Sequence, residues 1–287
     1  GGNKGEMTVK FGAEVGFQSV AKTIDVLNGK QYMETLNALR LESNNPEGAI
    51  YTAEQIAAVG KGTNWQDEIF RVSAPVQNYQ LSISGGSDKH DYYLGLSYFD
   101  QQGVVKLSSL KKYNVRANMN FTPKTFLRFK FNMNYTRTDG KSTYENMTGA
   151  NEAAGPINSA LQFDPTLAPG IDPETGRYRK NSFIALDNPQ ALLYGISPEK
   201  QGNSVYGTFT TEIEPFKDFV FTARLGATID SYTESSYRSR ETINGLASKG
   251  EASKKSGENT QWLAEFLLSY KKNFNDVHKL TFLAGAT

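Results

Sequence analysis

The sequence predicts an all-β fold, an antiparallel up-and-down meander of about nine strands. Segments in which apolar and polar residues alternate recur along the 287-residue chain, and short and long connections between them follow each other in turn. Soluble strands typically have about 5–6 residues, whereas a tilted strand that crosses a bilayer needs about 9–11. Several of these segments reach that greater length, so the pattern favours part of a large transmembrane β-barrel.

The first three strands are expected at residues 6–19, 76–84 and 92–104. In the first of them, Val9 and Phe11 fall on one side and Lys10 and Glu14 on the other. The second and third are joined by a tight polar turn within the run LSISGGSDKHDYYLGLSYFDQQGVV, so they predict a hairpin.

A short helix is expected in the connection between the first two strands. Within residues 25–43 the period of two is lost, and Tyr32, Leu36 and Leu39 recur at the spacing of one helical face. The sequence after this helix, through residues 64–67, has the composition of a loop.

The middle of the chain predicts a second hairpin, with strands at 113–121 and 127–135 around a turn at 122–125. A long irregular segment, 138–201, and a polar stretch, 231–259, separate the remaining strands. These strands are expected at 205–213, 219–229, 261–271 and 279–287.

The connections predict how the meander is oriented. The turns near Gly86, Pro123, Pro215 and Asn275 are short and the others are long. In a meander all the short turns then lie at one end, which is typical of an outer-membrane barrel with tight periplasmic turns and long extracellular loops. Tyr, Phe and Trp near the strand ends suit the two interfacial aromatic girdles of such a barrel.

The two faces of the strands predict which side chains meet lipid. A one-residue slip would place Arg116, Arg128 and Lys130 in lipid, at roughly 2–4 kcal/mol each near the midplane. We therefore expect the lumen to be lined by Arg116, Asn118, Arg128, Lys130 and Arg224. The side chains expected to face lipid are Val115, Met119, Phe129, Phe131, Met133, Phe221 and Leu225.

Composition excludes several classes of protein. Lys and Arg number 31 against 30 Asp and Glu, so no basic surface points to nucleic acid. Cysteine is absent, which excludes disulfides and cysteine metal sites. Mean hydropathy is −0.52, as alternating barrel strands allow. The chain opens GGNKGE without a signal peptide, so a processed precursor or an internal piece is expected.

The most specific signals lie within residues 64–121. The runs NWQDEIF, LSISGGSDKHDYYLGLSYFDQQGVV and YNVRANMNF resemble the start of the barrel in SusC/RagA-type TonB-dependent outer-membrane transporters. Upstream, GGNKGEMTVKFGAEVGFQS resembles the segment that follows the family's plug domain, and LNGKQYMETLN the helix in its first extracellular loop. Asn64 stands where the family more often has Asp.

The resemblance implies location, cargo and partners. It implies a bacterial outer-membrane importer of oligosaccharides or peptides that works with a SusD-like surface lipoprotein and TonB, and that contacts outer-membrane lipid. Barrels of this class have about 22 strands. Residues 1–287 would then be a partial barrel domain without the plug and the C-terminal part of the barrel.

Signals for catalysis are weak, and we expect no enzyme, no cofactor and no metal site. The two histidines, His90 and His278, are far apart in sequence and lie in expected turns. An S-x-x-K match at 108–111 lies in a loop, without the helix that would present it. The alternatives are a secreted soluble β-protein that binds glycans and, without a convincing triad, an outer-membrane barrel enzyme.

The long segment 138–201 holds the candidate ligand contacts. Its aromatic rings lie among Asn, Asp and Arg, a mixture that suits sugars or peptides. For any single ring, packing of the loop against itself or against a partner is the slightly favoured interpretation. The candidate rings for ligand or partner contact are Tyr144, Phe163, Tyr178, Phe183 and Tyr194.

Overall fold

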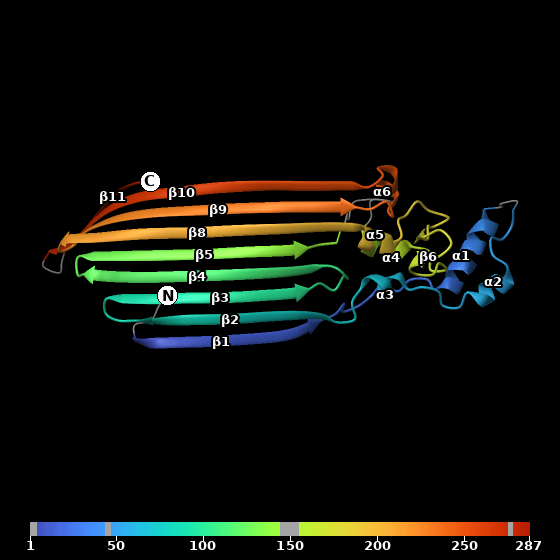
Figure 1. Cartoon of the computed structure of the whole chain (residues 1–287), viewed down its shortest axis with the longest axis horizontal. Coiled ribbons are helices and arrows are strands. Elements are labelled where there is room, and N and C mark those ends of the chain that lie inside the picture. Colours follow the sequence, from blue (N-terminus) through green and yellow to red (C-terminus); the bar gives the residue numbers. More distant parts are fainter. Residues whose placement is uncertain (1–4, 44–46, 144–154, 275–277) are drawn as a thin grey trace.

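A nine-stranded antiparallel sheet forms most of the computed structural model (Figure 1). The structure describes residues 5–43, 47–143, 155–274 and 278–287. Neighbouring strands of the sheet are consecutive, so the predicted meander is confirmed and no Greek-key crossing occurs in the described sheet. The strands are β1 (Gly5–Gln18), β2 (Ala74–Gly86), β3 (His90–Gln102), β4 (Ser109–Lys124), β5 (Leu127–Lys141), β8 (Ile196–Phe216), β9 (Phe219–Arg238), β10 (Glu251–Phe274) and β11 (His278–Ala286).

Strands β8, β9 and β10 exceed the lengths that the sequence pattern predicts by the widest margin. β8 begins at Ile196 rather than near 205, β9 continues to Arg238, and β10 begins at Glu251 within the stretch expected to be a polar connection. In these extensions polar residues pair across strands, as where Lys200 Nζ lies 2.7 Å from Glu234 Oε1. Cross-strand pairs of opposite charge stabilise a sheet without an apolar face, so alternation alone does not reveal such strands.

The short turns lie together at one end of the sheet (Figure 1). The β2–β3, β4–β5 and β8–β9 turns are all there, as predicted, and the last of them uses Asp218 with φ 73°. Aspartate tolerates this left-handed conformation better than most residues. The turn predicted near Asn275 falls at residues 275–277, outside the described residues, between the paired Phe274 and His278.

Helices and long connections lie at the opposite end, and this group is called the cap below (Figure 1). The helix predicted within 25–43 is confirmed as α1, and Asn28 and Gln31 form a capping box at its start. The described part of the segment expected to be irregular, 138–201, contains two helices and a small hairpin. The cap consists of α1 (Gly29–Glu42), α2 (Ala53–Ala58), α3 (Trp65–Ile69), α4 (Pro156–Gln162), α5 (Pro189–Gly195), α6 (Ile243–Ala247), the hairpin β6 (Ile171–Asp172) with β7 (Arg177–Tyr178), and their connections.

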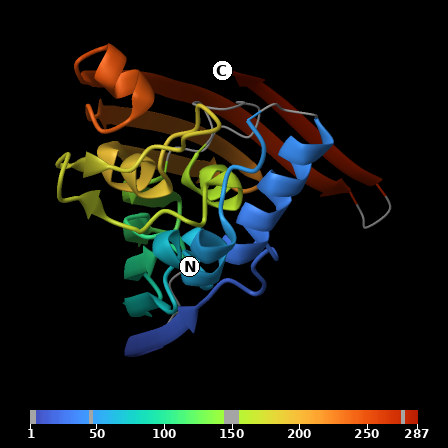
Figure 2. The ribbon, with the colours of Figure 1, turned by 90° about the vertical axis from the view of Figure 1, so that its right-hand side faces the viewer.

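The sheet is curved rather than flat. Viewed from the cap, its strands follow an arc, and the cap helices gather within that arc (Figure 2). β1 and β11 form the two edges of the described sheet. Within the described ranges, no helix has the length and apolar character needed to span a membrane.

Candidate functional site

The cap has its own hydrophobic core, centred on Trp65 of α3. Trp65 is 1% exposed and its ring meets that of Phe163 edge-on, with centroids 5.0 Å apart. The indole Nε1 of Trp65 donates a hydrogen bond to the backbone oxygen of Asp164 over 2.9 Å. Loops distant in sequence therefore pack into one unit, whose buried apolar residues are Trp65, Ile69, Val105, Ala160, Phe163, Leu186 and Leu193.

Polar side chains of α3 fix the surrounding loops. The Gln66 side chain donates to the backbone oxygen of Ile24 (2.7 Å) and accepts from its backbone nitrogen (3.0 Å). The carboxylate of Glu68 accepts a 2.7 Å hydrogen bond from Gln190 on α5. The run NWQDEIF thus holds the cap together, which gives these residues a structural role.

An open groove of about 610 Å³ lies beside this core. Trp65 and Phe163 form part of its wall, and Tyr32 of α1 contributes a phenol. Burial, and secondarily the negative charge of Asp164, raises the pKa of Tyr32 to about 12. The groove is lined by Ile24, Asp25, Val26, Leu27, Gln31, Tyr32, Thr63, Trp65, Ala160, Leu161, Gln162, Phe163 and Pro165.

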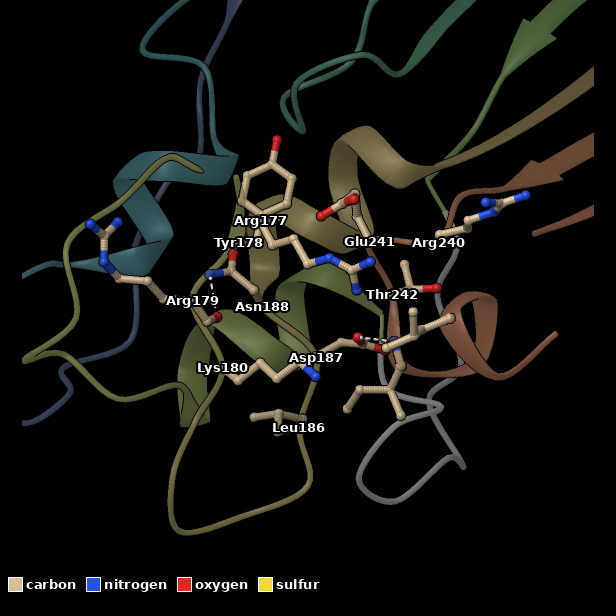
Figure 3. Close-up of a pocket in the computed structure, with 12 residues that line it drawn as sticks. Arg177, Tyr178, Arg179, Lys180, Leu186, Asp187, Asn188, Arg240, Glu241 and Thr242 are labelled. Atoms are coloured by element: carbon tan, nitrogen blue, oxygen red, sulfur yellow. Dashed lines mark hydrogen bonds between the residues drawn. The ribbon is translucent and has the colours of Figure 1, made fainter. Parts of the chain in front are cut away.

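A second hollow, between β7 and α6, is too small for a ligand (Figure 3). Its volume is about 20 Å³, room for about one water. Asp187 accepts a 2.6 Å hydrogen bond from the backbone nitrogen of Ile243 there. Figure 3 shows the guanidinium groups of Arg179 and Arg240 pointing away on opposite sides. These two guanidinium groups therefore do not converge on one anion.

The candidate ligand rings occupy different environments. Phe163 is 4% exposed and belongs to the cap core. Tyr178 is half-buried beside the small hollow, and burial raises the pKa of its phenol. Phe183 and Tyr194 are exposed, and Tyr144 lies outside the described residues. Of the candidate rings that the structure describes, only Phe163 lines the groove. Contact of these rings with a ligand stays a prediction.

The register of the sheet separates the two predicted sets of wall residues. On one face, Met119 lies opposite Phe131, which lies opposite Phe209, and Phe209 in turn lies opposite Leu225. Since side chains alternate, Val115, Phe129, Met133 and Phe221 share this face. The opposite face carries Arg116, Asn118, Arg128, Lys130 and Arg224.

The polar face carries a network of ion pairs. Arg128 lies 2.9 Å from Glu212 and 3.3 Å from Glu214, and Lys130 also contacts Glu212. Arg224 donates to Glu265 on β10 over 2.9 Å. These cations are satisfied across strands, as a surface that faces water or a polar lumen requires.

The apolar face is a continuous belt that no described element covers. Phe131 is 41% exposed, Leu225 53% and Phe266 47%. The described part of the chain forms this sheet and the two-stranded β6–β7 hairpin, with no second sheet to pack on the belt. A soluble sandwich would bury this face against another layer.

Aromatic rings border the belt on both sides. Tyr98 lies between Tyr79 and Tyr113, with centroid distances of 6.4 and 5.0 Å, nearer the cap. Phe129 lies 6.4 Å from Phe121 and 5.9 Å from Phe209, nearer the short turns. Tyr113 and Phe121 are about 27 Å apart along β4, at about 3.4 Å per residue. This spacing is comparable to the roughly 25 Å apolar band of outer-membrane barrels.

The chain is similar in sequence to curated TonB-dependent receptors. The chain is 28% identical over 289 residues to "TonB-dependent receptor P3" of Formosa agariphila, an alignment with 99% of this chain and 27% of that protein. It is 32% identical over 203 residues to "TonB-dependent receptor SusC" of Bacteroides thetaiotaomicron, with 68% of this chain and 18% of that protein. No family model matches.

The chain is a homologue of the SusC/RagA-type TonB-dependent receptors. Structures titled as the RagAB peptide importer share its fold. The "open-open" state superposes with a TM-score of 0.76 at 17% identity and the "closed-closed" state with 0.73 at 18%, each over 99% of this chain and about a third of that one. The predicted outer-membrane location agrees with this family.

The 287-residue chain spans about a quarter of the length of the curated relatives that it matches. The runs quoted for the family resemblance lie in β1, α1, α3, the β2–β3 hairpin and β4. The sequence did not reveal the groove, because its walls come from residues 24–32 and 160–165, far apart in the chain. Within the described residues, no group of three or more His, Cys, Asp or Glu is placed to hold a metal ion.

Proposed function

We propose that this chain forms part of the barrel wall and the outer cap of a TonB-dependent importer in the bacterial outer membrane. Residues 1–287 would be a partial barrel domain, with the plug and the other strands supplied by the rest of a longer protein. Support comes from receptors that match 99% of the chain while it spans about a quarter of their length.

The observation that carries this proposal is the uncovered apolar belt. Large side chains such as Phe131, Phe209 and Phe266 would be exposed to water in a soluble protein. In a membrane they face lipid tails, and the ion-paired face lines the lumen. The lipid-facing and lumen-facing sets predicted from the sequence follow from this orientation.

The cargo and partners follow from the names of the relatives. SusC and the RagAB peptide importer belong to systems for nutrient uptake, so we propose oligosaccharides or peptides as cargo and a SusD-like surface lipoprotein as partner. TonB would supply the energy. The chain itself would carry out no chemical reaction, and its contribution is recognition and passage.

An uptake assay tests this function. Cells that express the full-length protein are supplied with fluorescent maltooligosaccharides or a fluorescent peptide mixture, with and without a functional TonB. We expect uptake of one cargo only when TonB is functional, and recovery of the protein in the detergent-soluble membrane fraction. Recovery in the aqueous fraction without detergent would favour the alternative, a secreted soluble β-protein that binds glycans.

A further inference from the structure

One residue that lines the groove of the cap is negatively charged, and none of its described lining residues is positively charged. Asp25 stands exposed in its lining, and among the described residues the carboxylate of Asp25 has no ion-pair partner. The other described lining residues are apolar, aromatic, amide or hydroxyl side chains, without a Lys or Arg. A ligand with positive charge would therefore meet attraction there, and an anionic ligand would meet repulsion.

A second carboxylate lies behind the wall of the groove. Asp164 is buried and its Oδ1 accepts hydrogen bonds from the backbone nitrogen (2.8 Å) and hydroxyl (2.7 Å) of Thr166. Burial is the largest cause that raises the pKa of Tyr32 and of Tyr51, and the negative charge of Asp164 is the second cause for both. The negative charge of Asp164 therefore acts on the same part of the cap as the two phenols.

The walls of the groove suit a long side chain with a charged tip. Ile24, Val26 and Leu27 are 60%, 39% and 45% exposed, and they offer apolar surface. Lysine and arginine place their methylene stems along such surface and keep the cation near an acid. Tyr32 is half-buried in the lining, and its ring adds attraction for a cation.

We propose that this groove binds a lysine or arginine side chain of a transported peptide. The inference rests on the proposed function, since it treats the groove as a contact for cargo. It goes further in choosing peptides over oligosaccharides for this site and basic peptides over acidic ones. A neutral sugar could donate hydroxyl hydrogen bonds to the carboxylate of Asp25, but it would gain no attraction between opposite charges.

Calorimetry on the full-length protein in detergent tests the preference. The probes are three peptides of equal length in which Ala alternates with Lys, Gln or Glu, and maltopentaose. We expect the Lys peptide to bind about tenfold more tightly than the Glu peptide, with the Gln peptide between them. An exposed charge pair contributes little, so Asp25→Asn should weaken the Lys peptide about three- to fivefold and leave the Gln peptide unchanged.

Two variants provide the controls. Glu34→Gln removes a carboxylate from an exposed position of α1 that does not line the groove, and should leave all affinities unchanged. Asp25→Glu keeps the charge and should retain the preference. Equal affinities for the Lys and Glu peptides, tighter binding of maltopentaose, or equal effects of Asp25→Asn and Glu34→Gln would overturn the proposal.

The outcomes separate this inference from the proposed function. Uptake that requires TonB, together with no charge preference at the groove, would support the proposed import function and contradict the basic-peptide site. A charge preference that depends on Asp25, together with uptake that does not require TonB, would support the basic-peptide site and contradict TonB-dependent import.

Discussion

At the scale of single residues, the cap depends on contacts between positions far apart in the chain. Trp65 and Asp164 are separated by 99 positions and are joined by the indole hydrogen bond. The Phe163 ring completes the same contact. No local periodicity marks such a pair, which explains why the sequence predicted Phe163 as a ligand contact and the structure places it in a core. The sequence offers one signal for this core, the Trp of NWQDEIF within a polar stretch.

Trp65→Ala should therefore destabilise the cap by about 3–5 kcal/mol, the usual range for a buried aromatic residue. The loss should stay within the cap, because the core of Trp65 is separate from the ladder of the sheet. Hydrogen exchange should show faster exchange in α3, α4 and α5 and unchanged protection in β4 and β5. The exposed Tyr194→Ala is the matched control and should change neither.

At the scale of elements, strands were predictable wherever one face is apolar. The hairpin of β4 and β5 alternates over residues 113–121 and 127–135, so its position and facing pattern could be deduced from a period of two. The outer parts of β8, β9 and β10 could not, because polar residues occupy both of their faces. The helix α1 was predictable from its spacing, whereas α4 and α5 are too short for a periodic signal.

Neighbouring positions of β5 offer a sharp test of the facing pattern. Phe131→Arg should impair assembly into the outer membrane, because a charge on the lipid side costs roughly 2–4 kcal/mol near the midplane. Asn132→Arg adds the same side chain one residue away, on the polar face, and should assemble normally. Heat modifiability of the full-length protein on gels measures assembly. Equal assembly of both variants, or failure of Asn132→Arg alone, would contradict the assignment.

At the scale of the whole molecule, one curved sheet has an apolar face and a polar, ion-paired face. Its apolar belt crosses the strands of the nine-stranded sheet from one edge, β1, to the other, β11. The short turns and the cap lie at opposite ends of this sheet (Figure 1). This arrangement follows from alternation, meander order and unequal connections, all present in the sequence. What the sequence could not supply is the shape of the cap, which arises from contacts among loops that the meander brings to one end.

The central claim is that the belt faces lipid and the ion-paired face does not. The chain has no cysteine, so single spin labels can be attached at Phe131→Cys, Asn132→Cys, Met133→Cys and Asn134→Cys in the full-length protein, without other cysteines, in bilayers. Electron paramagnetic resonance then compares collisions with oxygen, which concentrates in lipid, and with a water-soluble nickel chelate. We predict that labels at 131 and 133 collide mainly with oxygen, and that labels at 132 and 134 do not. The opposite alternation, or high exposure of all four labels to the nickel chelate, would contradict the account.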